Sequence, residues 1–382
     1  MVAIGDKLYV RAADRSIQEK AECGGAVTAL LKYMLEEKIV DGVLAMGKGK
    51  DIYDGVPKLI TDPAAISEIS GSLHCAPLLQ SKYIFKYLKD AKDANIAVVG
   101  VGCDSAAMMK MAQKGVLNLE RLVLIGLNCG GTMPPVKAQE MIRTVYNTDP
   151  KSVVKEEIAK GSFIIETADH QHVEHKIDEL EEMGYGRRAN CRRCEVKVPR
   201  MMDIACGNWG VIGEDAGKAT FVEVCTQSGA ALIDGAIAKN AITVKPAPAK
   251  GIEIRENIEK SMLGLAKKWQ DRDLKSPERN SDYWLSQFAK CIKCLGCISV
   301  CPVCVCDDCK IMSNQPYWFE QFKYPISPKL QYTRAAHLAN DCVNCGQCED
   351  VCPAEIPLSA FFQQSSKDFG RLFDQFDRMT SL

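Results

Sequence analysis

Two cysteine runs near the carboxyl end of the chain carry the clearest chemical signal. The first has the spacing C-x2-C-x2-C-x3-C-P from Cys291 to Pro302, and the second repeats it from Cys342 to Pro353. This is the spacing of bacterial-type ferredoxins, in which the fourth cysteine of each run binds the cluster of the other run. The sequence therefore predicts a domain that holds two 4Fe–4S clusters.

The exchanged fourth ligand divides eight cysteines into two sets. The predicted ligands are Cys291, Cys294, Cys297 and Cys352 for one cluster, and Cys342, Cys345, Cys348 and Cys301 for the other. Zinc ribbons are the alternative, but zinc binds two pairs of ligands, which leaves the third cysteine and the C-P ending unexplained. Three further cysteines between the runs, Cys304, Cys306 and Cys309, are given no role.

Four other cysteines could supply one more cluster. Cys191 and Cys194 form a CxxC pair, while Cys103 and Cys129 each follow an apolar run at a glycine turn. A CxxC pair alone is compatible with zinc, iron–sulfur or dithiol chemistry. A scattered cysteine is more often a small buried hydrophobe. We interpret the remaining ones in that way, namely Cys23, Cys75, Cys206 and Cys225.

A glycine pair and a basic cluster are candidate anion sites. Gly24 and Gly25 open an amphipathic segment, and a glycine turn at a helix start lets a phosphate approach free N–H groups. A plain turn into a helix explains the same residues. The basic residues around the CxxC pair would bind an anionic ligand if one lies nearby; the alternative is a run of charged side chains in solvent. They are Arg187, Arg188, Arg192, Arg193, Lys197 and Arg200.

The elements that must position these residues alternate between helix and strand. Helical periodicity over 26–38, 78–92 and 106–114 is separated by short apolar runs such as 95–101 and 122–127. This alternation predicts a mostly parallel sheet covered on both faces, with ligand sites beyond the carboxyl ends of its strands. A proline-rich stretch at 245–250 and a polar helix at 252–274 then lead to the cysteine-rich tail.

Composition narrows the class of protein. The 382 residues are 47% hydrophobic with a formal net charge of -1, so no overall field recruits nucleic acid. No segment reads as a secretory signal or a membrane span. Nineteen cysteines without such a signal indicate a cytoplasmic protein that uses thiols for metal or redox chemistry.

The order of these motifs resembles a known family. The matching segments are Gly24–Leu30, the strand that ends at Cys103, LIGLNCGG around Cys129, and CRRC followed by 202–207. Together, over residues 15–240, they resemble the beta subunits of coenzyme F420-reducing hydrogenase and F420-dependent formate dehydrogenase. The two-cluster tail is similar to the formate dehydrogenase form, because the hydrogenase subunit lacks such a tail.

The resemblance implies the fold, the domains and the cofactors. We expect an α/β (α+β) flavin domain with a mixed, mostly parallel sheet over 1–245, a linker helix over 246–285 and a ferredoxin-like domain over 286–382. The implied cofactors are FAD and three 4Fe–4S clusters, with coenzyme F420 as substrate. Cys103, Cys129, Cys191 and Cys194 become the ligands of the third cluster. Flavin or coenzyme contacts fall to Gly24, Gly25, Thr28, Arg192, Arg193 and Lys197.

Three departures from the family pattern affect these assignments. Gly102 stands where the family often has proline, and Glu195 and Val196 follow Cys194 where the family often has aspartate. Cys206 lies in a turn that differs from the family pattern, which makes it a competing fourth ligand.

The resemblance also implies a reaction and partners. FAD would exchange hydride with F420, and clusters would carry single electrons from a formate-oxidising molybdopterin alpha subunit, as part of methanogenesis. The tail would pass electrons to a heterodisulfide reductase or another redox complex. No side-chain base is required, so no catalytic residue is assigned. Two alternatives stay open: a hydrogenase-type beta subunit with a fused ferredoxin, and an electron-wiring module without F420 turnover.

Overall fold

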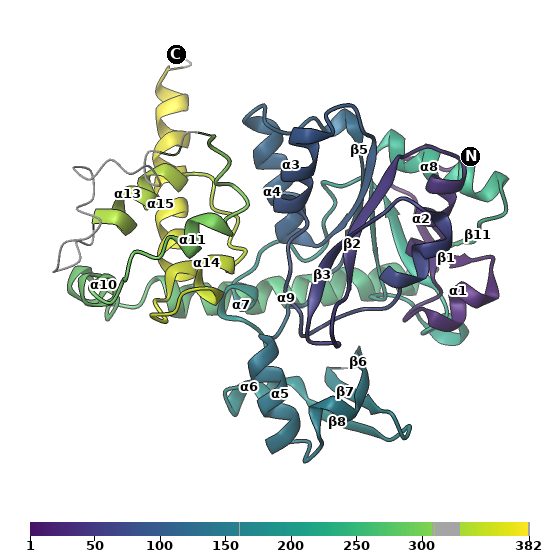
Figure 1. The fold of residues 1–382 in the computed structure, drawn as a ribbon, viewed down its shortest axis with the longest axis horizontal. Coiled ribbons are helices and arrows are strands. Elements are labelled where there is room, and N and C mark those ends of the chain that lie inside the picture. The colour runs from purple at the N-terminus through teal and green to yellow at the C-terminus, as the bar shows by residue number, and fades with distance from the viewer. Residues whose placement is uncertain (160, 308, 310–328, 381–382) are drawn as a thin grey trace. The chain divides into compact units, whose positions relative to one another are not determined.

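The computed structural model describes residues 1–159, 161–307, 309 and 329–380, in two compact units (Figure 1). Unit 1 consists of Met1–Arg188 and Val196–Leu263, and unit 2 of Ala189–Glu195 and Gly264–Leu382. The division falls inside the linker helix expected over 246–285. It also assigns the CxxC segment to the unit that contains the ferredoxin-type runs.

Unit 1 is built on an eight-stranded mixed sheet with the order β11-β1-β10-β9-β5-β4-β2-β3. Its central strands are parallel: β2 (Gly42–Lys48), β4 (Ile96–Gly100), β5 (Leu122–Leu127) and β9 (Ile204–Gly207). The flanking strands pair antiparallel: β1 (Lys7–Ala12), β3 (Gly55–Ile60), β10 (Thr220–Val224) and β11 (Ile242–Pro246). The expected parallel sheet is thus its centre, and its edges are antiparallel.

Helices bury the apolar residues of this sheet. α2 (Ala26–Glu36) packs with α8 (Gln227–Ala238), and their apolar faces form one core cluster with sheet residues such as Val99, Ile125 and Ile204. Strand alternation turns the intervening residues, such as Val98 and Leu124, to the opposite face. α3 (Ser81–Asp90) contacts α4 (Gly102–Gln113), and α4 packs on β4 and β5.

A smaller lobe of unit 1 carries a three-stranded antiparallel sheet (Figure 1). Its elements are α5 (Pro135–Thr144), β6 (Val153–Ala159), β7 (Ser162–Thr167), β8 (His172–Lys176) and α6 (Ile177–Glu182). Met141, Tyr146, Phe163 and Ile165 form its core. The remaining short helices of unit 1 are α1 (Arg15–Lys20), η1 (Pro63–Ile69), η2 (Leu119–Arg121), η3 (Pro150–Ser152) and η4 (Gly213–Asp215).

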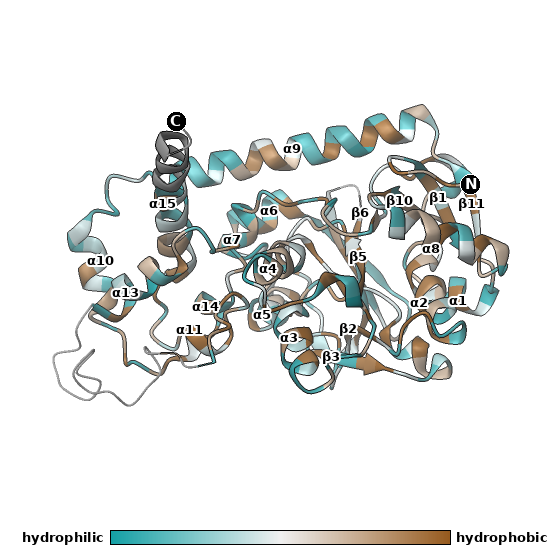
Figure 2. Cartoon of the chain, turned by 90° about the horizontal axis from the view of Figure 1, so that it is seen from above, coloured by the Kyte–Doolittle hydropathy of each residue, from teal (hydrophilic) through white to brown (hydrophobic). Residues whose placement is uncertain are grey.

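Unit 2 is helical in its described residues. Besides α7 (Ala189–Arg192) and the carboxyl half of α9 (Ala249–Leu274), it contains α10 (Ser281–Phe288), α11 (Gly296–Ser299), α13 (Lys329–Leu338), α14 (Gln347–Asp350) and α15 (Leu358–Thr380). Packed rings of Trp284, Phe288, Tyr332 and Phe361 join α10, α13 and α15. Figure 2 shows polar and apolar stretches alternating along α9. None of the described helices combines the length and apolarity needed to cross a membrane.

The expected elements of unit 1 are present, with one shift that matters for the site. The helix expected over 106–114 begins at Gly102, directly after β4, with Val101 as its extended N-cap. Cys103 therefore lies in the first turn of α4 instead of a loop before it. This turn is fixed by Asp104, whose buried carboxylate accepts a hydrogen bond from the Ser81 amide at 2.9 Å.

The core of unit 1 can be tested on a single helix. Ile233 of α8 is fully buried, whereas Ile237, four residues later, is 41% exposed. Ile233→Ala should lower the free energy of unfolding by about 2–5 kcal/mol, because it leaves a cavity in the core. Ile237→Ala should change it by less than about 0.5 kcal/mol. Urea unfolding of the two variants measures both; equal losses would contradict the packing described here.

Candidate functional site

One cavity of unit 2 is lined by the first cysteine set. Cys291, Cys294, Cys297 and Cys352 surround it, together with Gln331 and with apolar residues such as Ile292, Leu330 and Leu358. The first run can wrap around this space because Lys293 and Leu295 have left-handed backbone, with φ 56° and 60°. Leu295 starts the four-residue helix α11, which carries Cys297.

A second cavity is lined by the second cysteine set, Cys301, Cys342, Cys345 and Cys348. Asn344 and Gly346 repeat the left-handed backbone of the first run, with φ 53° and 75°. Gly346 starts the four-residue helix α14, which carries Cys348. Each cavity therefore takes its fourth cysteine from the other run, and iron ligation by these sets stays a prediction.

The donor chemistry of these sets suits clusters. Among the described residues, no group of three or more His, Cys, Asp or Glu side chains converges as ligands of one metal ion. The four cysteines of a cubane each bind a different iron and need only surround a space. Burial raises the pKa of Cys342 to about 11, and a metal cation bound to the sulfur would favour its thiolate form.

Cys304 contacts a predicted ligand although the sequence assigned it no role. Its hydrogen bonding lowers the pKa of the Cys301 thiol against the effect of burial. The amide of Cys304 also donates to the Cys301 carbonyl at 3.3 Å. We interpret Cys304 as a donor to the Cys301 sulfur. No signal in the spacing distinguishes such a donor from a spare ligand.

The CxxC segment is tied to the second cysteine run within unit 2. The Asn190 side chain donates to the Asn344 carbonyl at 3.1 Å, and the Asn344 side chain donates to the Asn190 carbonyl at 2.9 Å. A Cβ at Gly346 would lie 2.2 Å from the Asn190 side chain, so only glycine fits there. The side-chain amide of Asn190 also donates to Cys191 Sγ at 3.7 Å. One side chain therefore links a CxxC thiol to the loop before Cys345.

Arg193 has a structural role in unit 2, which differs from the coenzyme clamp expected from the sequence. It is 1% exposed, and its three guanidinium nitrogens donate to Asp273, Ser359 and Gln363 over 2.7–2.9 Å. These bonds hold the CxxC segment against α9 and α15. Arg192 instead lies over the Trp269 ring, 4.8 Å from its centre.

Contacts within unit 1 hold Cys103 and Cys129 beside the chain that follows the CxxC pair. A Cβ at Gly102 would lie 2.1 Å from the Val196 carbonyl oxygen, which explains glycine where the family often has proline. The Cys129 amide donates to the carbonyl of Lys197 at 2.9 Å. The Lys197 side chain is itself 1% exposed.

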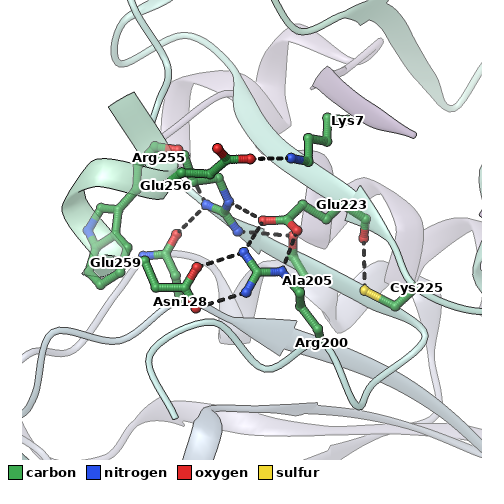
Figure 3. Close-up of polar contacts among 10 residues, drawn as sticks. Lys7, Asn128, Arg200, Ala205, Glu223, Cys225, Arg255, Glu256 and Glu259 are labelled. Atoms are coloured by element: carbon green, nitrogen blue, oxygen red, sulfur yellow. Dashed lines mark hydrogen bonds and ion pairs between the residues drawn. The ribbon is translucent and has the colours of Figure 1, made fainter. Parts of the chain in front are cut away.

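A buried ion-pair network fixes the loop of Cys129 (Figure 3). Arg255 is 1% exposed and donates to Glu223 at 2.5 Å and to the Asn128 side chain at 3.1 Å. Arg200 donates to the same carboxylate at 2.6 Å. Burial alone would raise the pKa of Glu223, but the two arginines hold it below its ordinary value. The network therefore fixes the orientation of the Asn128 side chain. Asn128 directly follows β5 and precedes Cys129.

The glycine turn at α2 is held by the chain itself. Gly24 and Gly25 have φ of 72° and 70°, and a Cβ at Gly24 would lie 2.5 Å from the Lys218 carbonyl oxygen. Gly25 caps α2 without a side-chain hydrogen bond, and Thr28 is buried in the first turn. A helix start of this kind leaves N–H groups for an anionic ligand, so the turn fits a phosphate.

A partly buried acid–histidine cluster beside this turn was missed from the sequence. His74 Nε2 lies 3.6 Å from the carboxylate of Glu22, which precedes the turn. Glu156 accepts the amides of His74 and Cys75 at 3.1 and 3.2 Å. Burial alone would lower the pKa of His74, but these carboxylates raise it above its ordinary value. The three residues are far apart in sequence and form no motif.

Two of the cysteines interpreted as apolar residues are fully enclosed, and a third, Cys23, is partly buried. Cys206 and Cys75 are fully buried, and Cys206 belongs to the main core cluster. The Cys206 side chain packs with sheet and helix residues, which supports the apolar interpretation over that of a competing ligand. Burial also raises the pKa of Cys23 to about 11.

The fold and the cysteine-lined cavities define an α/β redox subunit with a ferredoxin-type tail. Family models match over most of the chain: the N-terminal and C-terminal parts of the coenzyme F420 hydrogenase/dehydrogenase beta subunit match residues 8–84 and 93–250, and a 4Fe-4S dicluster domain matches residues 287–356. The chain therefore belongs to the coenzyme F420 hydrogenase/dehydrogenase beta-subunit family, an oxidoreductase family, and carries a 4Fe–4S domain.

Two similar proteins match almost the whole length of this chain in sequence. The F420-dependent formate dehydrogenase subunit beta of Methanocaldococcus jannaschii is 46% identical over 94% of this chain and 92% of its own. F420-dependent formate dehydrogenase 1 subunit beta of Methanococcus maripaludis is 49% identical over 93% and 91%. The fold also matches a chain in the F420-reducing [NiFe] hydrogenase complex of Methanosarcina barkeri, with a TM-score of 0.63 and 21% identity over 72% of this chain and 96% of that one.

The ion-pair network of Figure 3 should make the free energy of unfolding fall as the pH is lowered into the acid range. Because the folded pKa of Glu223 lies below its ordinary value of 4.5, its contribution is present above about pH 4.5 and is lost as pH falls through the folded pKa. Glu223→Gln should therefore lower the urea midpoint at pH 7 and flatten its fall in acid. The exposed carboxylate of Glu256 offers the control, since Glu256→Gln should change stability little. A wild-type acid profile in Glu223→Gln would contradict this role.

Proposed function

We propose that this chain is the beta subunit of an F420-dependent formate dehydrogenase and uses FAD to exchange hydride with coenzyme F420. The observation that carries the proposal is the match to two subunits of that name over 94% and 93% of the chain, which includes most of the tail. When bound, FAD exchanges hydride and single electrons, and 4Fe–4S clusters supply one-electron transfer. The residues of the chain bind, orient and insulate these groups.

The tail argues against the hydrogenase alternative. The coenzyme F420 hydrogenase subunit beta of Methanothermobacter thermautotrophicus is matched over 91% of its own length but over only 71% of this chain. The formate dehydrogenase subunits also cover the cysteine-rich tail. A formate-oxidising molybdopterin subunit is therefore the electron donor that we propose.

The turn at Gly24 and Gly25 is the proposed site for a phosphate of FAD or F420. Two observations support it: no side chain caps the start of α2 by a hydrogen bond, and Thr28 is buried in the first turn. Of the basic residues expected to clamp an anionic coenzyme, Arg192 and Lys197 stay in the proposal. Arg193 is set aside because its donors are engaged by Asp273, Ser359 and Gln363.

Cys103, Cys129, Cys191 and Cys194 are the proposed ligands of a third cluster. Chain connectivity supports this set. Val196, which touches Gly102, is two residues from Cys194, a reach of at most about 7 Å. Lys197, which accepts the Cys129 amide, is the next residue.

Electrons would leave or enter the tail at the first cavity. Cys294 is exposed, and Ile292 beside it is 57% exposed, although both line the cavity. The second cavity is more enclosed, since Cys301 and Cys345 are buried. An exposed apolar rim at a redox site suits a partner redox protein, such as a heterodisulfide reductase.

The cluster assignments predict an iron count. The anaerobically purified chain should contain about twelve irons, from three clusters of four. Cys194→Ala should lose about four of them because it removes a ligand of the proposed third cluster. Cys206→Ala is the matched control and should keep its iron, since that side chain lies in the apolar core. Iron and sulfide analysis measures the difference; full iron in Cys194→Ala would contradict the assignment.

The flavin site is tested by two glycine variants with the same backbone strain. Gly24 and Gly213 have φ of 72° and 66°, but only a Cβ at Gly24 meets the chain within 4 Å. Gly24→Ala should lose FAD and the reduction of a dye by reduced F420, whereas Gly213→Ala should keep both. Flavin absorbance and dye reduction measure these losses.

The partner is tested in the complex. Formate, and not hydrogen, should reduce F420 when the chain is purified with its catalytic subunit. A complex that contains nickel and responds to hydrogen would support the hydrogenase alternative. A chain that transfers electrons between dyes through its clusters but contains no flavin would support the wiring alternative.

A further inference from the structure

Helix α13 presents two buried polar side chains to the cysteine cavities of unit 2. Gln331 lines the first cavity and Arg334, three residues later, lines the second. This spacing puts both on one face of the helix. They are 2% and 1% exposed. The helix thus offers a neutral group to one cavity and a cationic group to the other.

The guanidinium of Arg334 is only partly satisfied by protein groups. Its Nη2 donates to the Cys297 carbonyl at 2.7 Å, and its central carbon lies 4.3 Å from the centre of the Phe362 ring. Nε and Nη1 find no acceptor among the described residues. Burial of a cation with unpaired donors is strongly destabilising, so the site calls for an anionic acceptor.

The groups near these donors that can become anionic acceptors are the sulfur atoms of cysteines. Arg334 lines the second cavity together with Cys301, Cys342, Cys345 and Cys348. Cys297, whose carbonyl accepts from Nη2, belongs to the set that lines the first cavity.

We propose that Arg334 is a positioning residue for the cluster of the second cavity, where Nε and Nη1 donate to its sulfur atoms and raise its reduction potential. Reduction adds negative charge in a buried space, and the potential of a cluster depends on net charge, hydrogen bonds to sulfur and exposure. A fixed cation with two donors favours the reduced form. Gln331, with Nε2 3.5 Å from Cys291 Sγ, supplies only a neutral donor to the first cavity. This inference rests on the two-cluster tail of the proposed function.

Redox titration of the full chain, followed by electron paramagnetic resonance, tests the proposal. Arg334→Gln removes the charge, and one of the two tail clusters should titrate at lower potential while the other changes little. Arg334→Lys keeps the charge, so its shift should be smaller. Gln331→Leu is the control on the same helix face, and it should leave the Arg334-dependent cluster at its wild-type potential.

If Arg334→Gln loses its iron, a measurement on the unaltered chain still tests the proposal. Arginine labelled with heavy nitrogen in the guanidinium should give a nitrogen coupling to a reduced tail cluster in pulsed resonance spectra, and Arg334→Lys should abolish it. Unchanged potentials in an iron-replete Arg334→Gln would overturn the proposal, as would a coupling that is missing or survives in Arg334→Lys. F420 is absent from these measurements. A chain that binds clusters but does not reduce F420 would therefore refute the proposed function and leave this inference intact.

Discussion

The burial of sulfur is the constraint on which unit 2 depends. Thiolates are costly in an apolar interior, and burial raises the pKa of Cys342 to about 11. The surrounding chain offsets this cost with Arg334 beside the second cavity, Gln331 at the first, and Cys304 at the sulfur of Cys301. Each donor comes from outside the three-cysteine turn that it serves. The fourth cysteine of each cavity also comes from outside that turn, because Cys352 lines the first cavity and Cys301 the second.

The CxxC segment belongs to this arrangement although it lies about a hundred residues earlier in the chain. Asn190 and Asn344 exchange hydrogen bonds, and Arg193 fastens the segment to α9 and α15. Within unit 1, the chain just after the segment is held by Gly102 and the Cys129 amide. Short contacts therefore restrain the segment within unit 2, and other short contacts restrain the chain that follows it within unit 1.

Unit 1 combines a rigid sheet with polar contacts at the ends of its strands. The parallel centre brings the carboxyl ends of β4 and β5 to one edge, where Cys103 lies in the first turn of α4 and Cys129 in the loop after β5. The Arg255–Glu223 pair sets the position of Asn128 beside Cys129 (Figure 3). The carboxylates around His74 gather at the glycine turn of α2. These contacts hold the candidate sites on the sheet and not on free loops.

Local spacing along the chain predicted the two ligand sets and was enough to indicate the alternation of helices and strands and the family. It also indicated the glycine turn, since positive φ at Gly24 and Gly25 demands that residue type. The tertiary structure decided what shares no local pattern. Arg193 became a structural residue, Arg334 turned toward the second cavity, and Glu22, His74 and Glu156 came together. The physical reason is that charge pairing in a buried site depends on which segments pack together, and spacing along the chain does not encode that.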